Sequence, residues 1–312
     1  MKRLALGVLT LFAVSIVVFA ATQALPGNAA RAILGKTATP EALAALTRQL
    51  HLNESVFTQY THWLGGVLTG NLGISAATQE PVAQLISSRI GNSGFLVLIA
   101  ALVALPLAIG LGVLMAVRRD KLTDQVLSTG SLMVAALPEF VIGIVLALVF
   151  ATNVARIFPA VSLLAPGQHA WDDPKVVVLP AATLVIAVTP YISRIMRGSM
   201  IEVLQSEYVT MARLKGMSER KVIWRHAVPN AIVPAIQVAA LQLAWMAGGV
   251  VVVEQVFDYP GIGQALISAV SDRDVPTVQA LALLIAGVYV IVNFLADLWT
   301  IVLTPRLRTT AK

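Results

Sequence analysis

Ser93 stands in the tetrapeptide GNSG at 91–94, the kind of glycine-flanked serine that can act as a nucleophile. A serine does so only with a base within hydrogen-bond reach. None of the histidines lies in a long apolar run; they are His51, His62, His169 and His226. We therefore expect no catalytic residue, and predict instead that Asn92 or Ser93 caps the start of an apolar helix.

Two further chemistries are excluded by the residues present. The tetrapeptide LGKT at 34–37 matches the end of a phosphate-binding loop, but Ala30 stands where that loop needs its first glycine. The chain has no cysteine, and no His, Asp or Glu pair has ligand spacing within an apolar run. We expect no ATP binding by this chain, no metal site and no cofactor of its own.

Two ionisable side chains stand inside apolar runs, where such groups are often functional. Glu139 follows Pro138, and it either contacts the ammonium group of a passing peptide or locks helices together as a protonated or paired acid. For Asp297 we expect a structural ion pair with Arg194 or Arg197.

A fifth apolar run carries amides, which seldom face lipid because an unsatisfied amide there is costly. Gln242, Trp245 and Met246 have the spacing of one helical face, and Gln237 precedes them. They are candidates for a substrate path, with bonding between helices as the alternative. Gly248 and Gly249 are expected to let this helix approach a neighbour closely.

The elements that position these residues follow from composition. Of 312 residues, 57% are apolar and only 12% are charged, against about 25% in soluble domains. Uncharged runs of membrane-spanning length recur. We predict an all-α integral membrane protein with six transmembrane helices at 4–25, 93–117, 125–150, 176–197, 231–253 and 279–303. The first follows Lys2 and Arg3, and we expect a retained span rather than a signal peptide.

Lys and Arg set the orientation. With the N-terminus inside, the internal segments hold fifteen basic residues and the longer external segments hold seven. This asymmetry places both termini in the cytoplasm by the positive-inside rule. The net charge of +6 is thus explained by topology, and no nucleic-acid partner is expected.

The longest internal segment, at about 198–230, is polar and basic. We expect a helix from Met200 to Lys215, a stop at Gly216, and a second helix capped by Ser218. That second helix places three apolar residues near one side: Val222, Ile223 and Ala227. Physics alone leaves two roles open, a basic helix on anionic lipid or a docking element for a cytoplasmic partner.

The stretch EYVTMARLKGMSERKVIWRHAVPN at 207–230 resembles the EAA loop of ABC-importer permeases. Gly216 and Pro229 have the spacing of that pattern, and Ala212 matches its second alanine. Thr210 stands at the glutamate position, Met211 at the first alanine and His226 at the isoleucine. The resemblance leaves open whether Glu207 supplies the acidic contact instead.

Other stretches resemble the B-type permease of the dipeptide/oligopeptide/nickel subgroup. They are LTRQLHLNESVFTQYTHWLGGVLTGNLGIS at 46–75, PVAQLISSRI at 81–90, GGVVVVEQVFDYPGIGQALISAV at 248–270, RDVP at 273–276 and TPRLR at 304–308. The resemblance implies a type I importer architecture in a prokaryotic cytoplasmic membrane. It divides the chain into a first helix plus external segment, 1–91, and a five-helix core, 92–312.

The resemblance also implies partners and a mechanism. A C-type sister permease, two cytoplasmic ATPases that use ATP and Mg, and an external binding protein would complete the transporter. ATPase contact would fall on Glu207, Thr210, Ala212, Arg213, Lys215, Gly216 and Pro229. The outer mouth would be gated by Glu254, Phe257, Pro260, Gly261 and Gly263.

The expected substrate is a di- or oligopeptide. Nickel chelates and glutathione are alternatives within the same family. A self-sufficient secondary transporter is the alternative of another class, although it would predict internal repeats and coupled midplane charges that the sequence lacks.

Overall fold

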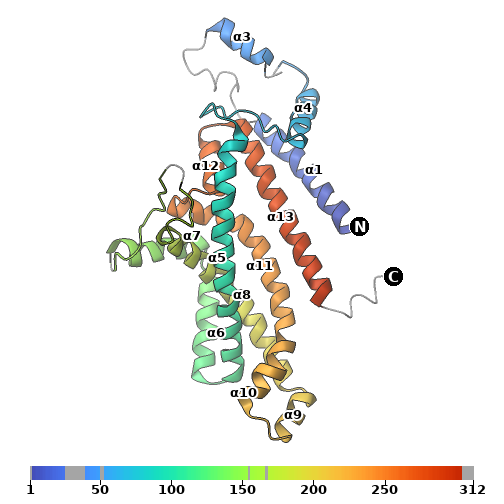
Figure 1. The fold of residues 1–312 in the computed structure, drawn as a ribbon, viewed down its shortest axis with the longest axis vertical. Helices are drawn as coiled ribbons and strands as arrows, with labels where there is room; N and C mark the ends of the chain where they lie inside the picture. The colour runs from blue at the N-terminus through green and yellow to red at the C-terminus, as the bar shows by residue number, and fades with distance from the viewer. Residues whose placement is uncertain (1, 25–38, 50–52, 154, 166–167, 304–312) are drawn as a thin grey trace.

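The computed structural model describes residues 2–24, 39–49, 53–153, 155–165 and 168–303 as an elongated bundle of helices (Figure 1). In these residues the only β-type pairing is an isolated bridge between Ile74 and Pro81. The helices are α1 Lys2–Gln23, α3 Pro40–Gln49, α4 Val56–Leu68, α5 Val82–Val117, α6 Leu122–Ala135, α7 Glu139–Ala147, α8 Lys175–Leu204, α9 Glu207–Leu214, α10 Glu219–Lys221, α11 Val228–Phe257, α12 Ile262–Ser271 and α13 Val275–Leu303. Two π-helical segments are η1 Leu148–Asn153 and η2 Val222–Ala227.

Five helices in the described part of the chain are long and apolar enough to cross a membrane. They lie in α1, α5, α8, the continuous stretch of α10, η2 and α11, and α13, close to five of the expected spans. The remaining expected span, the third along the chain at 125–150, is not one straight helix. It is the pair α6 and α7, bent by 104° at a short break.

Pro138 explains that break. It takes an extended conformation ahead of α7, with φ −60° and ψ 144°, and its missing N–H cannot continue the ladder of α6. Pro106, Pro180, Pro190 and Pro234 lie inside helices that continue past them. Neighbouring helices there can compensate for the lost hydrogen bond.

α5 begins at Val82, well before the expected start at 93. Asn92 and Ser93 are therefore interior helix residues, and the prediction that either caps this helix is wrong. The expected boundary between 1–91 and 92–312 falls inside α5, and the division stays a prediction.

The core is formed by α5, α8 and α11 packing along one another. Gly112 shows how close α5 and α8 lie, because a Cβ there would stand 2.6 Å from Cβ of Met196 and 2.7 Å from the carbonyl of Ser193. Small residues at such contacts are the usual means of close helix packing in membranes.

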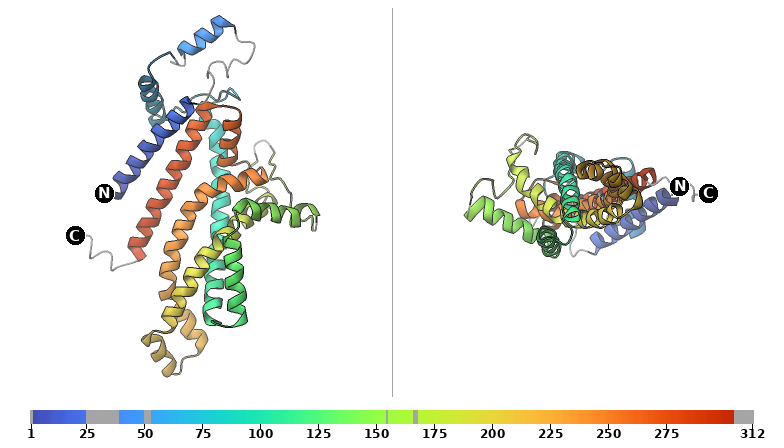
Figure 2. Two further views of the ribbon diagram at one scale, coloured as in Figure 1. Left: turned by 180° about the vertical axis from the view of Figure 1, so that it is seen from behind. Right: turned by 90° about the horizontal axis from the view of Figure 1, so that it is seen from below.

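α1 and α13 lie side by side at the edge of this core (Figure 2). Gln279 donates a hydrogen bond of 2.7 Å to Thr22, and a Cβ at Gly7 would meet Val290 at 3.0 Å. The first residues of α1 and the last of α13 point away from α3 and α4 (Figure 1). The basic-residue asymmetry still carries the prediction that this side faces the cytoplasm.

Candidate functional site

The segment between α8 and α11 projects from the end of the bundle opposite α3 and α4 (Figure 1). The expected single helix from Met200 to Lys215 is wrong in one respect, because the chain breaks at Gln205 and Ser206 before α9 begins. The stop at Gly216 is confirmed. Its φ of 77° is left-handed, its N–H donates to Arg213, and the N–H of Met217 donates to Ala212.

One face of α9 is packed against the rest of the segment. Val209, Ala212 and Val222 form a small buried cluster, with Leu204 and Met217 at its margin. The apolar side expected for the second helix is also confirmed, because Val222, Ile223 and Ala227 are all buried. Ala212 thus positions α9 from inside and offers no surface to a partner.

The other face of α9 carries large apolar side chains in the open. Tyr208 is 45% exposed, Met211 57% and Leu214 76%. Glu207, Thr210 and Lys215 are also exposed. Apolar surface at the tip of a projecting helix is typical of a contact with another molecule.

Arg213 is held inside the segment. It donates to both carboxylate oxygens of Glu219, at 2.7 and 3.1 Å, and to the carbonyl of Leu204 at 3.2 Å. The hydrogen bond from Arg213 lowers the pKa of Glu219, and the pKa of Arg213 is raised by the same bond. This ion pair links α9 to α10 across the Gly216 turn.

α10, η2 and α11 form one connected helical path into the membrane-spanning region. Ser218 has the extended backbone of a cap, although its side chain makes no capping hydrogen bond. Pro229 is at the start of α11 and is exposed. Since Pro229 has no N–H to donate one turn back, the preceding turn widens into the π-helical η2.

The candidates for a substrate path differ in their exposure in the structure. Gln237 and Gln242 are half-buried, and Trp245 is 41% exposed, whereas Met246 is 1% exposed within the core. Met246 therefore does not line a passage in this conformation. Glu139 is half-buried at the first position of α7, and no hydrogen bond or ion pair to it occurs among the described residues.

Arg197 pairs with Asp124, and the expected pairing of Asp297 with Arg194 or Arg197 stays a prediction. Its Nε and Nη2 each donate to a carboxylate oxygen of Asp124 at 2.7 Å. Asp124 is buried, and it also accepts from Ser128 and from the backbone of Asp120. The side chain of Asp297 lies outside the described residues.

The prediction of a close neighbour at Gly248 and Gly249 is wrong for the described chain. A Cβ at Gly248 would meet nothing within 4 Å, and one at Gly249 would meet only Trp245 of the same helix.

The five gate candidates gather at a buried joint between α5, α11 and α12. Glu254, expected to gate the outer mouth, is fully buried at the end of α11. Ser93 donates to its carboxylate at 2.5 Å, and the N–H groups of Gly263 and Gln264 donate at 2.7 and 3.2 Å. Ser93 in turn accepts a hydrogen bond of 2.9 Å from the N–H of Ile262, so the hydroxyl and the carboxylate together satisfy the first free N–H groups of α12.

The glycines at this joint are required by space. A Cβ at Gly261 would lie 2.1 Å from Oε1 of Glu254, and one at Gly263 would lie 2.4 Å from Cα of Val251. Pro260 accepts a hydrogen bond of 3.0 Å from Asn92, and buried Phe257 accepts one of 2.7 Å from the N–H of Ser162.

A second buried carboxylate, which the sequence did not single out, lies between α12 and α13. Asp274 accepts from Ser75, from the N–H of Ala76 at 2.9 Å and from Thr277 at 2.7 Å. The start of α12 is therefore fastened to α5 through Ser93, and the connection from α12 to α13 is fastened to the segment before α5 through Ser75.

Among the described residues, no group of three or more His, Cys, Asp or Glu side chains is placed to hold a metal ion. The LGKT stretch at 34–37 lies outside the described residues. The described chain thus combines an exposed tip on α9, a continuous helical path and a buried joint at the far end of α11.

Comparison with known proteins shows which protein family this chain resembles. Binding-protein-dependent transport system inner membrane components match residues 108–309, and their N-terminal part matches residues 1–93. A probable peptide ABC transporter permease protein, y4tP of Sinorhizobium fredii, is 36% identical over 308 residues, covering 99% of this chain and 98% of its own length. Glutathione transport system permease protein GsiC of Escherichia coli is 32% identical over 307 residues, covering 98% of this chain and 97% of its own length.

The chain therefore belongs to the family of binding-protein-dependent transport system inner membrane components. It is an ABC importer permease of the inner membrane and is not itself an enzyme. The predicted all-α membrane fold, importer class and membrane location are confirmed. This membership argues against the alternative of a self-sufficient secondary transporter.

Proposed function

We propose that this permease imports peptides and that α9 is the element through which partner ATPases drive it. The exposed apolar face of Tyr208, Met211 and Leu214 carries the proposal. Such a face projects from the end of the bundle and is fixed from behind by the buried cluster of Val209 and Ala212. A docking helix needs an exposed apolar surface that is held in a fixed position, and α9 has both properties.

The proposed assembly contains this chain as the B-type permease, a related C-type permease, two cytoplasmic ATPases and an external binding protein. ATP and Mg would be bound by the ATPases. Within α9 and its surroundings, Glu207, Thr210 and Lys215 would contact an ATPase directly. Ala212, Arg213, Gly216 and Pro229 would hold the geometry, because they are buried, paired or placed at turns.

Transmission would run along α11. Because α10, η2 and α11 are connected, a displacement of α9 is passed to a helix that ends at the Glu254 joint. ATP-driven closure of the ATPases would then bias the packing between two conformations of the permease. The gate candidates Glu254, Phe257, Pro260, Gly261 and Gly263 would respond at the far end as one fastened unit.

The peptide substrate is favoured by the name of the y4tP relative. Peptides offer N–H and C=O groups along their length, which the half-buried amides of Gln237 and Gln242 can both donate to and accept from. Glu139, without a partner in the described chain, would meet a peptide's ammonium group. Glutathione is the second candidate, because the GsiC relatives are named for it.

Uptake into proteoliposomes tests the substrate directly. The complete transporter, with ATP inside, should accumulate labelled di- and oligopeptides in a manner that unlabelled peptide suppresses. Glutathione and a nickel chelate should be taken up at least about tenfold more slowly. Saturable glutathione uptake without peptide uptake would instead assign the second candidate, and uptake without ATP would refute ATPase coupling.

A further inference from the structure

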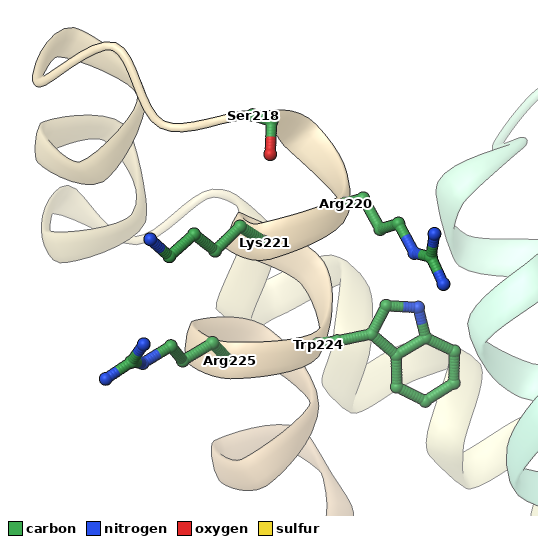
Figure 3. A pocket seen from close by; sticks show the side chains of 5 residues that line it. All are labelled: Ser218, Arg220, Lys221, Trp224 and Arg225. Carbon is green, nitrogen blue, oxygen red and sulfur yellow. The ribbon is translucent and has the colours of Figure 1, made fainter.

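A basic hollow lies on α10 and η2, apart from the exposed face of α9 (Figure 3). It has a volume of about 540 Å³ and is lined by Ser218, Arg220, Lys221, Trp224 and Arg225. The three cationic side chains are exposed, and no acidic partner to them occurs in the described part of the chain. The neighbouring acid, Glu219, is already occupied by Arg213.

The side chains fall into two pairs, each four residues apart. Figure 3 shows Lys221 and Arg225 projecting together on one side, with Arg220 and Trp224 together on the other. Like charges with this spacing destabilise a helix. An anion between Lys221 and Arg225 would remove that repulsion.

Trp224 indicates the depth at which the hollow lies. Its indole is 57% exposed. The helical stretch Glu219–Met246 contains an apolar window long enough to cross a membrane, and the hollow lies at its basic N-terminal end. Tryptophan concentrates at the level of lipid headgroups, and anionic headgroups attract clustered Lys and Arg at that level.

We propose that this hollow binds the phosphate headgroup of an anionic phospholipid. Arg220 and Arg225 supply planar donor groups that suit phosphate oxygens, Lys221 supplies a point charge, and the Trp224 indole lies at the interface. The bound lipid would hold the root of the segment at the membrane surface. The tip on α9 stays free for a protein partner.

Lipid retention by the purified assembled transporter tests this site. Native mass spectrometry in a neutral detergent would measure phosphatidylglycerol bound during a titration, with phosphatidylcholine as the uncharged comparison. The wild type should retain phosphatidylglycerol and not phosphatidylcholine. The triple variant Arg220→Gln, Lys221→Gln, Arg225→Gln should bind it at least about tenfold more weakly.

The matched control removes equal charge from another exposed basic segment, through Arg118→Gln, Arg119→Gln, Lys121→Gln. It should change phosphatidylglycerol binding by less than about twofold. The charge-preserving variant Arg220→Lys, Arg225→Lys should keep most of its phosphatidylglycerol binding. It tests the role of positive charge in the hollow even if the triple variant fails to fold. Equal losses in both triple variants would reduce the effect to overall charge and overturn the site.

Two other outcomes would also overturn it. If inorganic phosphate binds alone and displaces phosphatidylglycerol completely, the hollow is a site for free anions. If the triple variant at Arg220, Lys221 and Arg225 loses the ATPases while its phosphatidylglycerol binding is unchanged, the hollow is a protein-docking surface.

Discussion

The two ends of this permease differ in whether their functional side chains are buried and hydrogen-bonded or exposed. At the joint of α5, α11 and α12, buried Glu254 and Asp274 are supplied with hydrogen-bond donors from the same chain. At the α9 end, apolar and cationic side chains stand exposed with no partner among the described residues; they include Met211, Leu214, Lys221 and Arg225.

This difference distinguishes residues that stabilise the fold from residues that contact other molecules. A buried carboxylate must be satisfied internally, since an unpaired one is strongly destabilising. Exposed apolar and cationic groups at the other end gain their favourable contacts only from other molecules. Changes at the joint should therefore alter stability, and changes at the α9 tip should alter assembly.

The largest effect on stability is expected from Gly261→Val. The new side chain would overlap the Glu254 carboxylate, whose Oε1 is 2.1 Å from the Cβ position. We expect a loss of about 3 kcal/mol or more, because overpacking and broken hydrogen bonds add. Thermal unfolding of the purified protein would measure it.

The matched control is Gly94→Ala on α5, where a Cβ meets nothing within 4 Å. A wild-type melting temperature in Gly261→Val would contradict the tight joint.

Glu254→Ala should have the next largest effect. It leaves the N–H groups of Gly263 and Gln264 without their acceptor, and we expect a cost of about 2–4 kcal/mol. Asp272→Ala, at an exposed acid beyond α12, should change stability by less than about 0.5 kcal/mol. Comparison of the two melting curves checks the prediction, and equal shifts would argue against it.

Gly216→Val should cost about 1–2 kcal/mol, because its φ of 77° is unfavourable for a β-branched residue. Its main effect should be on transport, since the turn aims α9. ATP-dependent uptake should fall at least about tenfold at equal protein level, with Gly216→Asn, which tolerates this conformation better, as the milder comparison. Unchanged uptake in Gly216→Val would exclude a role for the turn.

The smallest effect is expected from Glu219→Gln, because its ion pair with Arg213 is largely solvent-exposed. We expect about 0.5 kcal/mol or less. Since Arg213 lowers the folded-state pKa of Glu219, the pair contributes above the unfolded-state pKa, and its contribution is lost as pH falls through the folded-state pKa. A stability difference between wild type and variant that grew on acidification would contradict this sign.

Local features of the sequence were predictable. Gly216 and the buried side of Val222, Ile223 and Ala227 depend only on glycine's conformational freedom and helical periodicity. The break at Pro138 was not, because Pro106 and Pro190 have the same local signal and remain inside helices.

Long-range pairs were also beyond reach. Ser93 meets Glu254 across 161 positions, and Arg197 meets Asp124 across 73. Both acids were visible in the sequence, but their burial depends on which helices pack together.

Co-purification with the partner ATPases tests the central claim most directly. The double variant Met211→Asp, Leu214→Asp alters only exposed side chains of α9, and Val56→Asp, Phe57→Asp makes the same change at exposed residues of α4. We predict that the α9 variant keeps its melting temperature and its sister permease but loses the ATPases, while the α4 variant keeps all three. ATPases retained at wild-type levels by the α9 variant would contradict the assignment of α9 as the coupling element.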